Sequence, residues 1–436
     1  MNTGQERINE FVIREKRGRL GMRSEWTKKK LSDIVDFNPR ETIKKGTIAK
    51  KIPMDVLRPF YRDIPYYVEA CFSSGMKFRN GDTIMARITP CLENGKTAQV
   101  SILNDGEVGF GSTEYIVFRA KEGIADKDYL YYLVCSPEVR ELAIKSMVGS
   151  SGRQRVQTDV VKNLEIDVPP LVEQEKIGSL LKLFDDKIAL NDRINNNLEQ
   201  QAVVLFRSWF SAFSLSPNSP RINSEFGEIP EDFEVVKVGS LPMLVTDYVA
   251  NGSFASLKAN VNLYQEPNYA YFIRNTDLKS GTFGVFVDQH SYEFLSKSTL
   301  YGGEIIISNV GDVGSVFLCP KLDGRMTLGN NIIMLRPEDD HLRYYLYIWF
   351  KYLQGKALIQ GIKGGSAQPK FNKTDFKNTS ILIPPKDILT RFHETVAPMF
   401  ETISQRQTET SCLTDLRDTL LPQLMSGELD VSGIVL

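Results

Sequence analysis

Two short segments of this chain combine glycine, serine and glutamine with positive charge. The first is GSSGRQR at residues 149–155, and the second is KGGSAQPK at residues 363–370. Glycine lets a backbone approach a groove closely, serine can bond phosphates, arginine can bind guanine through two hydrogen bonds, and glutamine can read adenine. These segments therefore favour contact with DNA, and a solvated turn before a strand is the alternative. The side chains expected to make the contacts are Ser151, Arg153, Gln154, Arg155, Lys363, Ser366, Gln368 and Lys370.

A second set of candidates lies outside these segments. Arg87 and Lys96 follow a β-branched run in the first half of the chain and are predicted to face DNA. The alternative for Arg87 is a structural role, either capping a sheet edge or pairing with a nearby acid. In the second half, Asn309, Asn330 and Asn331 could reach bases, and Asn330 is kept as the predicted contact. The alternative for all three is a simple turn, because asparagine beside glycine is typical of turns.

Residues suited to catalysis or metal binding are sparse. Five scattered cysteines form no C-x-x-C pair and three histidines are widely spaced, so neither a zinc site nor a disulfide framework is indicated. The chain has no G-x-x-x-x-G-K-[ST] loop, no N-P-P-[YFW] text and no convincing paired-acid-plus-lysine nuclease site. We therefore expect no catalytic residue, no metal ligand and no bound cofactor in this chain.

Composition places the chain among soluble, multidomain proteins. Its 436 residues suit two to four domains, and its 42% hydrophobic and 25% charged content is ordinary. No apolar run approaches the length of a membrane helix, and the charged N-terminus is not expected to be a signal peptide. The scattered, odd-numbered cysteines lead us to expect a reducing cytoplasm. The net charge of −1 differs from the strongly basic charge of a free-standing DNA binder. This suggests that partner proteins supply some of the contacts to DNA phosphates.

The order of parts is repeated about 215 residues apart. Lys162-Asn163 and Pro169-Pro170 recur as Lys377-Asn378 and Pro384-Pro385, and upstream TEYIVFR corresponds to NNIIMLR. The predicted parts are an N-terminal extension at 1–24, a strand-rich region at 25–168, a long helix at 169–213, a linker at 214–227, a second strand-rich region at 228–383, and a second long helix with a tail at 384–436.

Both predicted helices, at about 171–212 and 386–426, carry apolar residues at alternating steps of three and four. This spacing favours an antiparallel coiled coil, and two separate amphipathic helices are the alternative. In both copies the seam turns polar at its middle, at Asn191 and Asn195 and at Arg406 and Thr410. Polar residues that meet at the midpoint would fix the register of the pair. The apolar seam positions are Ile177, Leu181, Phe184, Ile188, Leu198, Leu205, Trp209, Val396, Met399, Ile403, Leu413 and Leu420.

The ordered set of motifs resembles the DNA-specificity subunit of type I restriction–modification systems. The resemblance rests on GDTIMARITP at 81–90 with ENGK at 93–96, VPPLVEQEKI at 168–177, the entry at 226–233, and LLPQLMSGEL at 420–429. It covers the chain after residue 24. The second copy departs from the pattern at residues 309–314, which read NVGDVG, so matching of residues between the copies is uncertain near 305–320.

The resemblance implies an α+β fold with two tandem target-recognition domains, separated by two long helices in an antiparallel coiled coil with a pseudo-two-fold repeat. It also implies that each domain reads half of a bipartite double-stranded DNA target and that the helices set the spacing. The expected partners are two methyltransferase subunits and restriction–translocase subunits, which would carry S-adenosylmethionine, ATP and Mg. The alternatives are a protein–protein scaffold, or a methyltransferase or nuclease in its own right.

Overall fold

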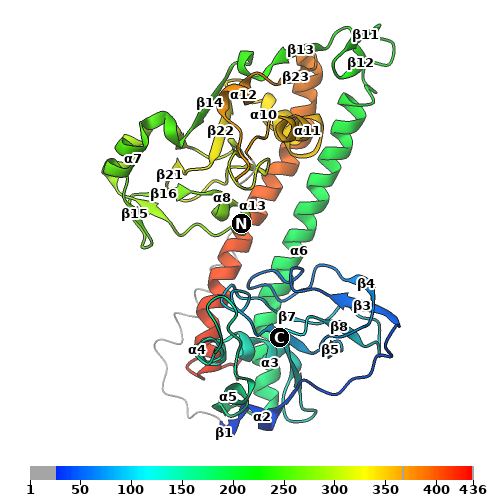
Figure 1. Cartoon of the computed structure of the whole chain (residues 1–436), viewed down its shortest axis with the longest axis vertical. Helices are drawn as coiled ribbons and strands as arrows, with labels where there is room; N and C mark the ends of the chain where they lie inside the picture. The colour runs from blue at the N-terminus through cyan, green and yellow to red at the C-terminus, as the bar shows by residue number, and fades with distance from the viewer. Residues whose placement is uncertain (1–25, 366–367, 435–436) are drawn as a thin grey trace. The chain divides into compact units, whose positions relative to one another are not determined.

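The computed structural model describes residues 26–365 and 368–434, and these residues form two compact units. Unit 1 contains the described parts of Met1–Leu190 and Cys412–Leu436, and unit 2 those of Asn191–Ser411. Two helices of 40 residues, α6 (Leu171–Phe210) and α13 (Lys386–Met425), contribute to both units (Figure 1). They begin and end within two residues of the predicted bounds, so the long helices are confirmed.

The strand-rich part of unit 1 contains two four-stranded sheets and a two-stranded one. In the first sheet β2, β9, β6 and β7 pair antiparallel, and in the second the order is β4-β3-β8-β5 with β3 and β8 parallel. The elements are β1 (Thr27–Lys30), α2 (Leu31–Ile34), β2 (Val35–Phe37), β3 (Ile48–Ile52), β4 (Val68–Cys71), β5 (Lys77–Phe78), β6 (Thr83–Ala86), β7 (Thr97–Gln99), β8 (Gly109–Gly111), β9 (Tyr115–Ala120), α3 (Lys127–Cys135), α4 (Pro137–Lys145), α5 (Thr158–Lys162) and β10 (Glu165–Val168).

Unit 2 repeats this plan with a five-stranded sheet in place of the second four-stranded sheet. Its four-stranded sheet has the order β14-β22-β19-β20, and the larger sheet has the order β15-β17-β16-β21-β18. The elements are β11 (Arg221–Ser224), β12 (Gly227–Pro230), β13 (Glu234–Lys237), β14 (Met243–Asp247), α7 (Phe254–Asn260), β15 (Leu263–Tyr264), β16 (Ala270–Ile273), α8 (Asn275–Ser280), β17 (Phe286–Val287), α9 (Gln289–Phe294), β18 (Thr299–Leu300), β19 (Ile305–Ser308), β20 (Val316–Leu318), β21 (Arg325–Leu328), β22 (Ile332–Pro337), α10 (Leu342–Tyr352), α11 (Gln354–Gly361), α12 (Lys373–Lys377) and β23 (Ser380–Ile383), with 3-10 helices at Val238–Ser240, Tyr248–Asn251 and Ser296–Ser298.

The repeated Pro-Pro dipeptide joins a strand to a long helix in the same way in each unit. β10 pairs antiparallel with β1, and β23 pairs antiparallel with β13. The carbonyl of Pro170 accepts the first helical bond from Gln174 at 3.0 Å, and that of Pro385 accepts from Leu389 at 3.0 Å. Proline suits this position because its missing N–H has no helical acceptor there.

A matched ion pair fastens the central strand of each four-stranded sheet. In unit 1, Arg119 on β9 donates to both carboxylate oxygens of Asp82 at 2.7 Å. In unit 2, Arg336 on β22 donates to Glu304 at 3.0 Å. Each acid lies directly before the neighbouring strand, β6 or β19, and is almost fully buried. Each unit therefore contains an equivalent internal ion pair, in addition to the same order of elements.

The core of each unit includes residues of the long helices. In unit 1, Ile177 and Leu181 of α6 are fully buried with Leu424 of α13. In unit 2, Phe206 of α6 packs against both Tyr345 and Phe392, with ring centroids 5.0 and 5.7 Å apart. Each strand-rich region thus completes its core with helical side chains.

The segment at 214–227, expected to be a linker, packs onto the core of unit 2. Leu215 and Phe226 are partly buried against this core, and the Phe226 and Trp349 rings lie 5.4 Å apart, edge to face. Ser219 Oγ donates to Asp232 at 2.9 Å. The segment also holds β11 and the start of β12, which form a hairpin.

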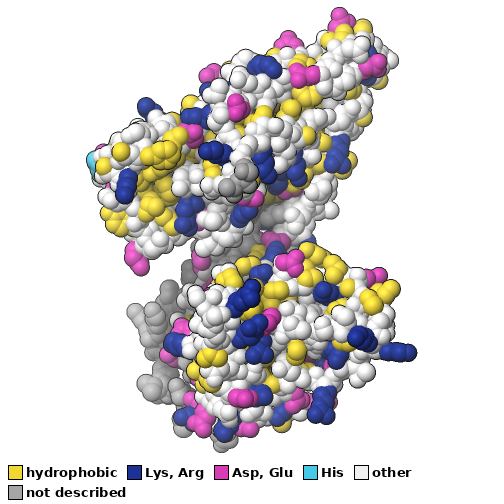
Figure 2. Space-filling view, in the orientation of Figure 1, with side chains coloured by type: hydrophobic (Ala, Val, Ile, Leu, Met, Phe, Trp, Pro, Cys, Tyr) yellow, Lys and Arg dark blue, Asp and Glu magenta, His cyan; other side chains and the backbone are white. Residues whose placement is uncertain are grey.

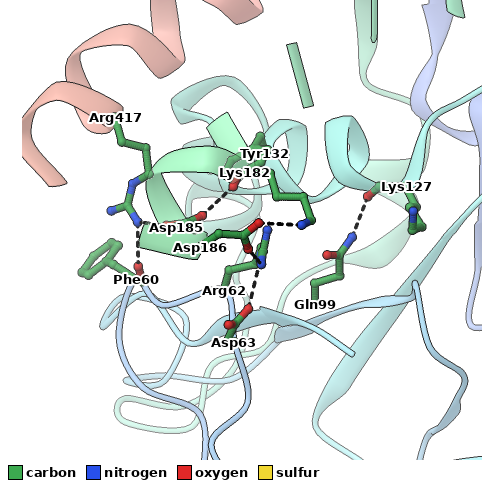
Figure 3. Close-up of polar contacts among 10 residues, drawn as sticks. All are labelled: Phe60, Arg62, Asp63, Gln99, Lys127, Tyr132, Lys182, Asp185, Asp186 and Arg417. Carbon is green, nitrogen blue, oxygen red and sulfur yellow. Dashed lines mark hydrogen bonds and ion pairs between the residues drawn. The ribbon is translucent and has the colours of Figure 1, made fainter. Parts of the chain in front are cut away.

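A buried polar network in unit 1 joins the two long helices to the strand-rich region (Figure 3). Asp185 of α6 accepts from Arg417 of α13 at 2.5 Å and from the Tyr132 hydroxyl of α3 at 2.5 Å. The adjacent Asp186 accepts from Arg62 at 2.5 Å. Burial, followed by the charge of Asp185, raises the pKa of Tyr132 well above its usual range, so this hydroxyl stays a hydrogen-bond donor.

Candidate nucleic-acid interface

The glycine-rich segment of unit 1 forms a closed loop from Val148 to Arg155. Val148 and Arg155 exchange backbone hydrogen bonds of 2.9 and 3.0 Å, and Arg155 also forms an antiparallel bridge with Ile88. Gly149 has φ 138°, and a Cβ there would lie 2.8 Å from the Arg153 carbonyl oxygen. Glycine is thus required for the tight turn that closes this loop.

The second segment forms the same frame in unit 2. Gly364 and Lys370 exchange two backbone hydrogen bonds of 2.9 Å, and Lys370 bridges Val310 as Arg155 bridges Ile88. Arg155 and Lys370 are therefore equivalent, and the pairing also matches Ile88 with Val310 across the stretch where the sequence alignment was uncertain. Ser366 lies outside the described residues.

Arg155 is already engaged by an acid in unit 1. Its Nε lies 3.0 Å from both Glu114 carboxylate oxygens, and its Nη2 donates to Glu114 Oε1 at 2.6 Å. This hydrogen bonding holds the pKa of Glu114 below its usual range, so the carboxylate stays charged at neutral pH. The Arg155 side chain nevertheless remains 47% exposed.

The other candidates of unit 1 divide into free and engaged side chains. Ser151 and Arg153 are exposed, and no side-chain hydrogen bond of either is found within the described residues. The Gln154 N–H donates to the Thr89 hydroxyl, and the Gln154 carbonyl accepts from the Thr89 N–H, both at 3.1 Å. Arg87 Nη2 donates to the Val156 carbonyl at 3.2 Å, while its buried Nε has no partner among the described atoms.

Lys96 is turned toward the protein. Its Nζ donates to the Met54 carbonyl at 2.8 Å, and the side chain is partly buried. This contact assigns Lys96 a structural role in the described structure, in contrast to the predicted DNA contact.

The candidates of unit 2 lie at the surface. Lys363, Gln368, Lys370 and Asn330 are exposed, and their side chains make no hydrogen bond to another described residue. Asn331, which stands at the position of Glu114, adopts a left-handed φ of 65°, as asparagine tolerates in turns. The two loops thus share a backbone frame and differ in the side chains that they present.

The candidate Asn309 lies beside this loop rather than at its tip. Its amide nitrogen donates to the Phe371 carbonyl at 3.4 Å, and its Oδ1 is buried without a partner among the described residues.

The predicted helical seam differs in burial along its length. Ile177, Leu181, Phe184 and Ile188 are buried in unit 1. Val396 is fully buried in unit 2. The remaining apolar positions are partly buried, and they are Leu198, Leu205, Trp209, Met399, Ile403, Leu413 and Leu420. At the middle, in unit 2, Arg406 donates to Asn191 at 2.9 Å, so the predicted polar positions do meet.

Sequence reasoning missed the partners of the engaged side chains. Glu114 and Asp185 were not singled out, although each bonds an arginine. One signal was available for the second pair, because Arg417 occupies an otherwise apolar seam position. A charge at such a position needs a buried counter-charge.

Neither a metal site nor a membrane segment is found within the described part of the chain. No group of three or more histidine, cysteine or acidic side chains there is placed to hold a metal ion. None of the helices at 26–365 and 368–434 combines the length and apolarity that crossing a bilayer requires. On the face drawn in Figure 2, basic and acidic side chains are interspersed in both units.

Comparison with known proteins places the chain in a family. A family model described as the type I restriction modification DNA specificity domain matches twice, over residues 23–200 and 230–409. The chain belongs to this family. The resemblance inferred from its motifs is therefore confirmed, and its function is DNA target specificity within a type I restriction–modification system.

Individual relatives agree with this assignment. The type I restriction enzyme MjaIX specificity subunit of Methanocaldococcus jannaschii is 30% identical over 325 residues, covering 72% of this chain and 71% of that protein. The HindI specificity subunit of Haemophilus influenzae is 25% identical over 411 residues, covering 80% and 87%. A crystal structure of the type I restriction–modification S subunit from M. genitalium covers 93% of this chain and 98% of its own, with a TM-score of 0.50 and 16% identity, which supports the fold.

Proposed function

We propose that unit 1 and unit 2 of this specificity subunit each read one half of a bipartite double-stranded DNA target. The observation that carries the proposal is the loop frame closed by Arg155 in one unit and by Lys370 in the other. The same backbone presents an arginine–glutamate pair in unit 1 and lysine and amide groups in unit 2. Two frames with different side chains suit two half-sites of different sequence.

In this proposal side chains of the two loops, together with Asn330, contact DNA. The contacting side chains are Ser151, Arg153, Gln154, Arg155, Lys363, Gln368, Lys370 and Asn330. Arg87 supports the loop through its bond to the Val156 carbonyl. The long helices set the spacing of the half-sites, since about 40 residues at ~1.5 Å rise give a rod of roughly 60 Å, longer than one ~34 Å turn of duplex.

The chain itself catalyses no step in this proposal. Two methyltransferase subunits dock on the helices and bind S-adenosylmethionine, and restriction–translocase subunits supply ATP- and Mg-dependent cleavage. Docking is supported by apolar side chains that α6 leaves exposed, among them Leu183 and Leu190, seven residues apart in unit 1, and Val204 in unit 2. A partner that covers these side chains would gain from burying their apolar surface.

The test is to co-express the chain with methyltransferase subunits from its genomic neighbourhood and to map methylated adenines by long-read sequencing. The expected result is a bipartite motif with a fixed gap. Adding or removing one base pair in the gap should abolish modification. A complex that assembles without a methyltransferase and shows no motif would contradict the proposal and favour a protein–protein scaffold.

A further inference from the structure

One edge of the Arg155 guanidinium is occupied and the other is open. A guanidinium carries five N–H donors in a planar fork. Glu114 accepts from Nε and Nη2, at 3.0 and 2.6 Å. Nη1 has no partner among the described residues, and the side chain is 47% exposed. The edge formed by Nη1 and Nη2 is therefore available for two parallel hydrogen bonds directed away from Glu114.

The backbone holds both members of this pair in place. The Arg87 N–H donates to the Glu114 carbonyl at 2.9 Å, and the Arg87 carbonyl accepts from Val156 at 2.9 Å. Arg155 itself lies between antiparallel bridges to Val148 and Ile88. A side chain whose backbone and orienting partner are both fixed is pre-organised for recognition, so it loses little freedom on binding.

The charge balance also favours a nucleic-acid ligand. Two guanidinium groups act on the Glu114 carboxylate. Arg155 acts through hydrogen bonds, and Arg87 acts through its charge. The three side chains together carry one net positive charge. The hydrogen bonds from Arg155, supported by the charge of Arg87, hold the pKa of Glu114 low, so the orienting carboxylate remains ionised at neutral pH.

We propose that Glu114 is a positioning residue that presents the Nη1–Nη2 edge of Arg155 to a guanine in the half-site read by unit 1. Guanine is the base that offers two acceptors, O6 and N7, to such an edge in the major groove. This inference rests on the proposed function. Asn331 and Lys370 occupy the equivalent positions of unit 2, so that unit lacks the arginine–carboxylate pair and its half-site lacks this contact.

Arg153 has a different role in the same loop. Its side chain is exposed and no described residue orients it. It is therefore suited to contact a phosphate, because a guanidinium can bind a phosphate in any orientation. Such a contact carries no base preference.

The experiment uses the chain co-purified with its methyltransferase partners and duplexes of the wild-type motif. Each guanine is replaced in turn by 7-deazaguanine, which lacks the N7 acceptor. We expect one guanine at which this replacement weakens wild-type binding about tenfold, because it removes one of the two acceptors of the bidentate contact. In the Arg155→Lys variant, binding to the unmodified duplex should fall by a similar factor, and 7-deazaguanine at that position should have a smaller effect than in the wild type, because one ammonium lacks the paired donors of the guanidinium fork.

Glu114→Gln and Lys370→Gln complete the design. Glu114→Gln keeps the shape but loses the charge that orients the guanidinium, so it should relax selectivity at the same guanine and nowhere else. Lys370→Gln is the matched control in unit 2 and should leave that guanine unaffected. Thermal unfolding of each complex checks that the variants are folded. If Arg155→Lys does not fold, the test is whether 7-deazaguanine weakens binding less in Glu114→Gln than in the wild type.

The outcomes distinguish failure of the proposed function from failure of the arginine–glutamate inference. Absence of any bipartite motif for the wild type overturns the proposed function. A wild-type motif whose guanines are all insensitive to N7 removal, or equally selective in Arg155→Lys and Glu114→Gln, overturns the arginine–glutamate inference alone.

Discussion

Arg406 donates a hydrogen bond of 2.9 Å to Asn191, and these two residues occupy equivalent positions of the repeat, 215 residues apart. Asn191 also donates to Glu409 at 2.9 Å. A residue that contacts its own counterpart is expected where two equivalent helices cross antiparallel at equivalent points. Because Asn191 is fully buried, its bonds specify the register of α6 against α13 in unit 2.

Asn191→Leu should therefore destabilise unit 2. The substitution removes the acceptor of Arg406, whose Nε already has no partner among the described residues, and we expect a loss of about 1–3 kcal/mol. Urea unfolding measures this loss. Asn196→Leu, an exposed position on the same helix, is the control and should change stability by less than about 0.5 kcal/mol. Equal effects of the two variants would contradict a register role for Asn191.

Arg417→Met should destabilise unit 1 more strongly. Both side chains of the Arg417–Asp185 pair are less than 10% exposed, so removing Arg417 leaves a buried carboxylate without its counter-charge. The expected loss is about 3–5 kcal/mol. Adding Asp185→Asn should recover most of it while preserving an acceptor for Tyr132. The measurement is hydrogen exchange of the α3 and α6 amides in unit 1, with the exposed Arg207→Met as control. No recovery in the double variant would argue against an electrostatic origin.

The stability of unit 1 should fall in acid through Glu41. Hydrogen bonds from Arg79, at 2.6 and 2.9 Å, and then from Arg119 hold the pKa of Glu41 below its ordinary value of 4.5. A lowered pKa in the folded state means that ionised Glu41 stabilises the fold above about pH 4.5, and this contribution is lost as pH falls through the lowered value.

Glu41→Gln provides the test. The variant should unfold at a lower temperature than the wild type at pH 7, and the difference should shrink below about pH 4.5. A difference that stays constant down to pH 3, in melting curves recorded across this range, would show that the ionised form contributes nothing specific.

Loop variants should affect the half-sites separately. Arg153→Ala should weaken DNA binding through a lost phosphate contact, reduce the salt slope by about 1 and alter only contacts to the half-site of unit 1, whereas Lys370→Ala should act on the other half-site. Footprinting of the assembled complex on duplexes with one scrambled half-site distinguishes the two. Lys96→Met is the control, because its ammonium bonds the Met54 carbonyl and its loss should lower stability rather than affinity. Equal losses on both halves for Arg153→Ala would rule out a domain-local role.

Local patterns in the sequence were enough to predict the repeat, the two long helices and the meeting of their polar midpoints. Periodicity of three and four residues reports the face that a helix buries, and the Pro-Pro dipeptides mark the start of each helix. Both are properties of neighbouring residues. The contact between Asn191 and Arg406 followed because symmetry of the repeat relates distant positions without any knowledge of side-chain geometry.

The partners of individual charges were decided by the tertiary structure. Arg155 bonds Glu114, which is 41 residues away in the sequence, and Lys96 bonds the Met54 carbonyl, 42 residues away. Arg417 bonds Asp185, at a separation of 232 residues. Two basic residues that looked alike in the sequence thus differ, since the Lys96 ammonium bonds a backbone carbonyl and Arg155 keeps one edge exposed. Residue type and spacing along the chain specify which groups can donate, but only the packing of distant strands and helices determines which acceptor lies within 3 Å.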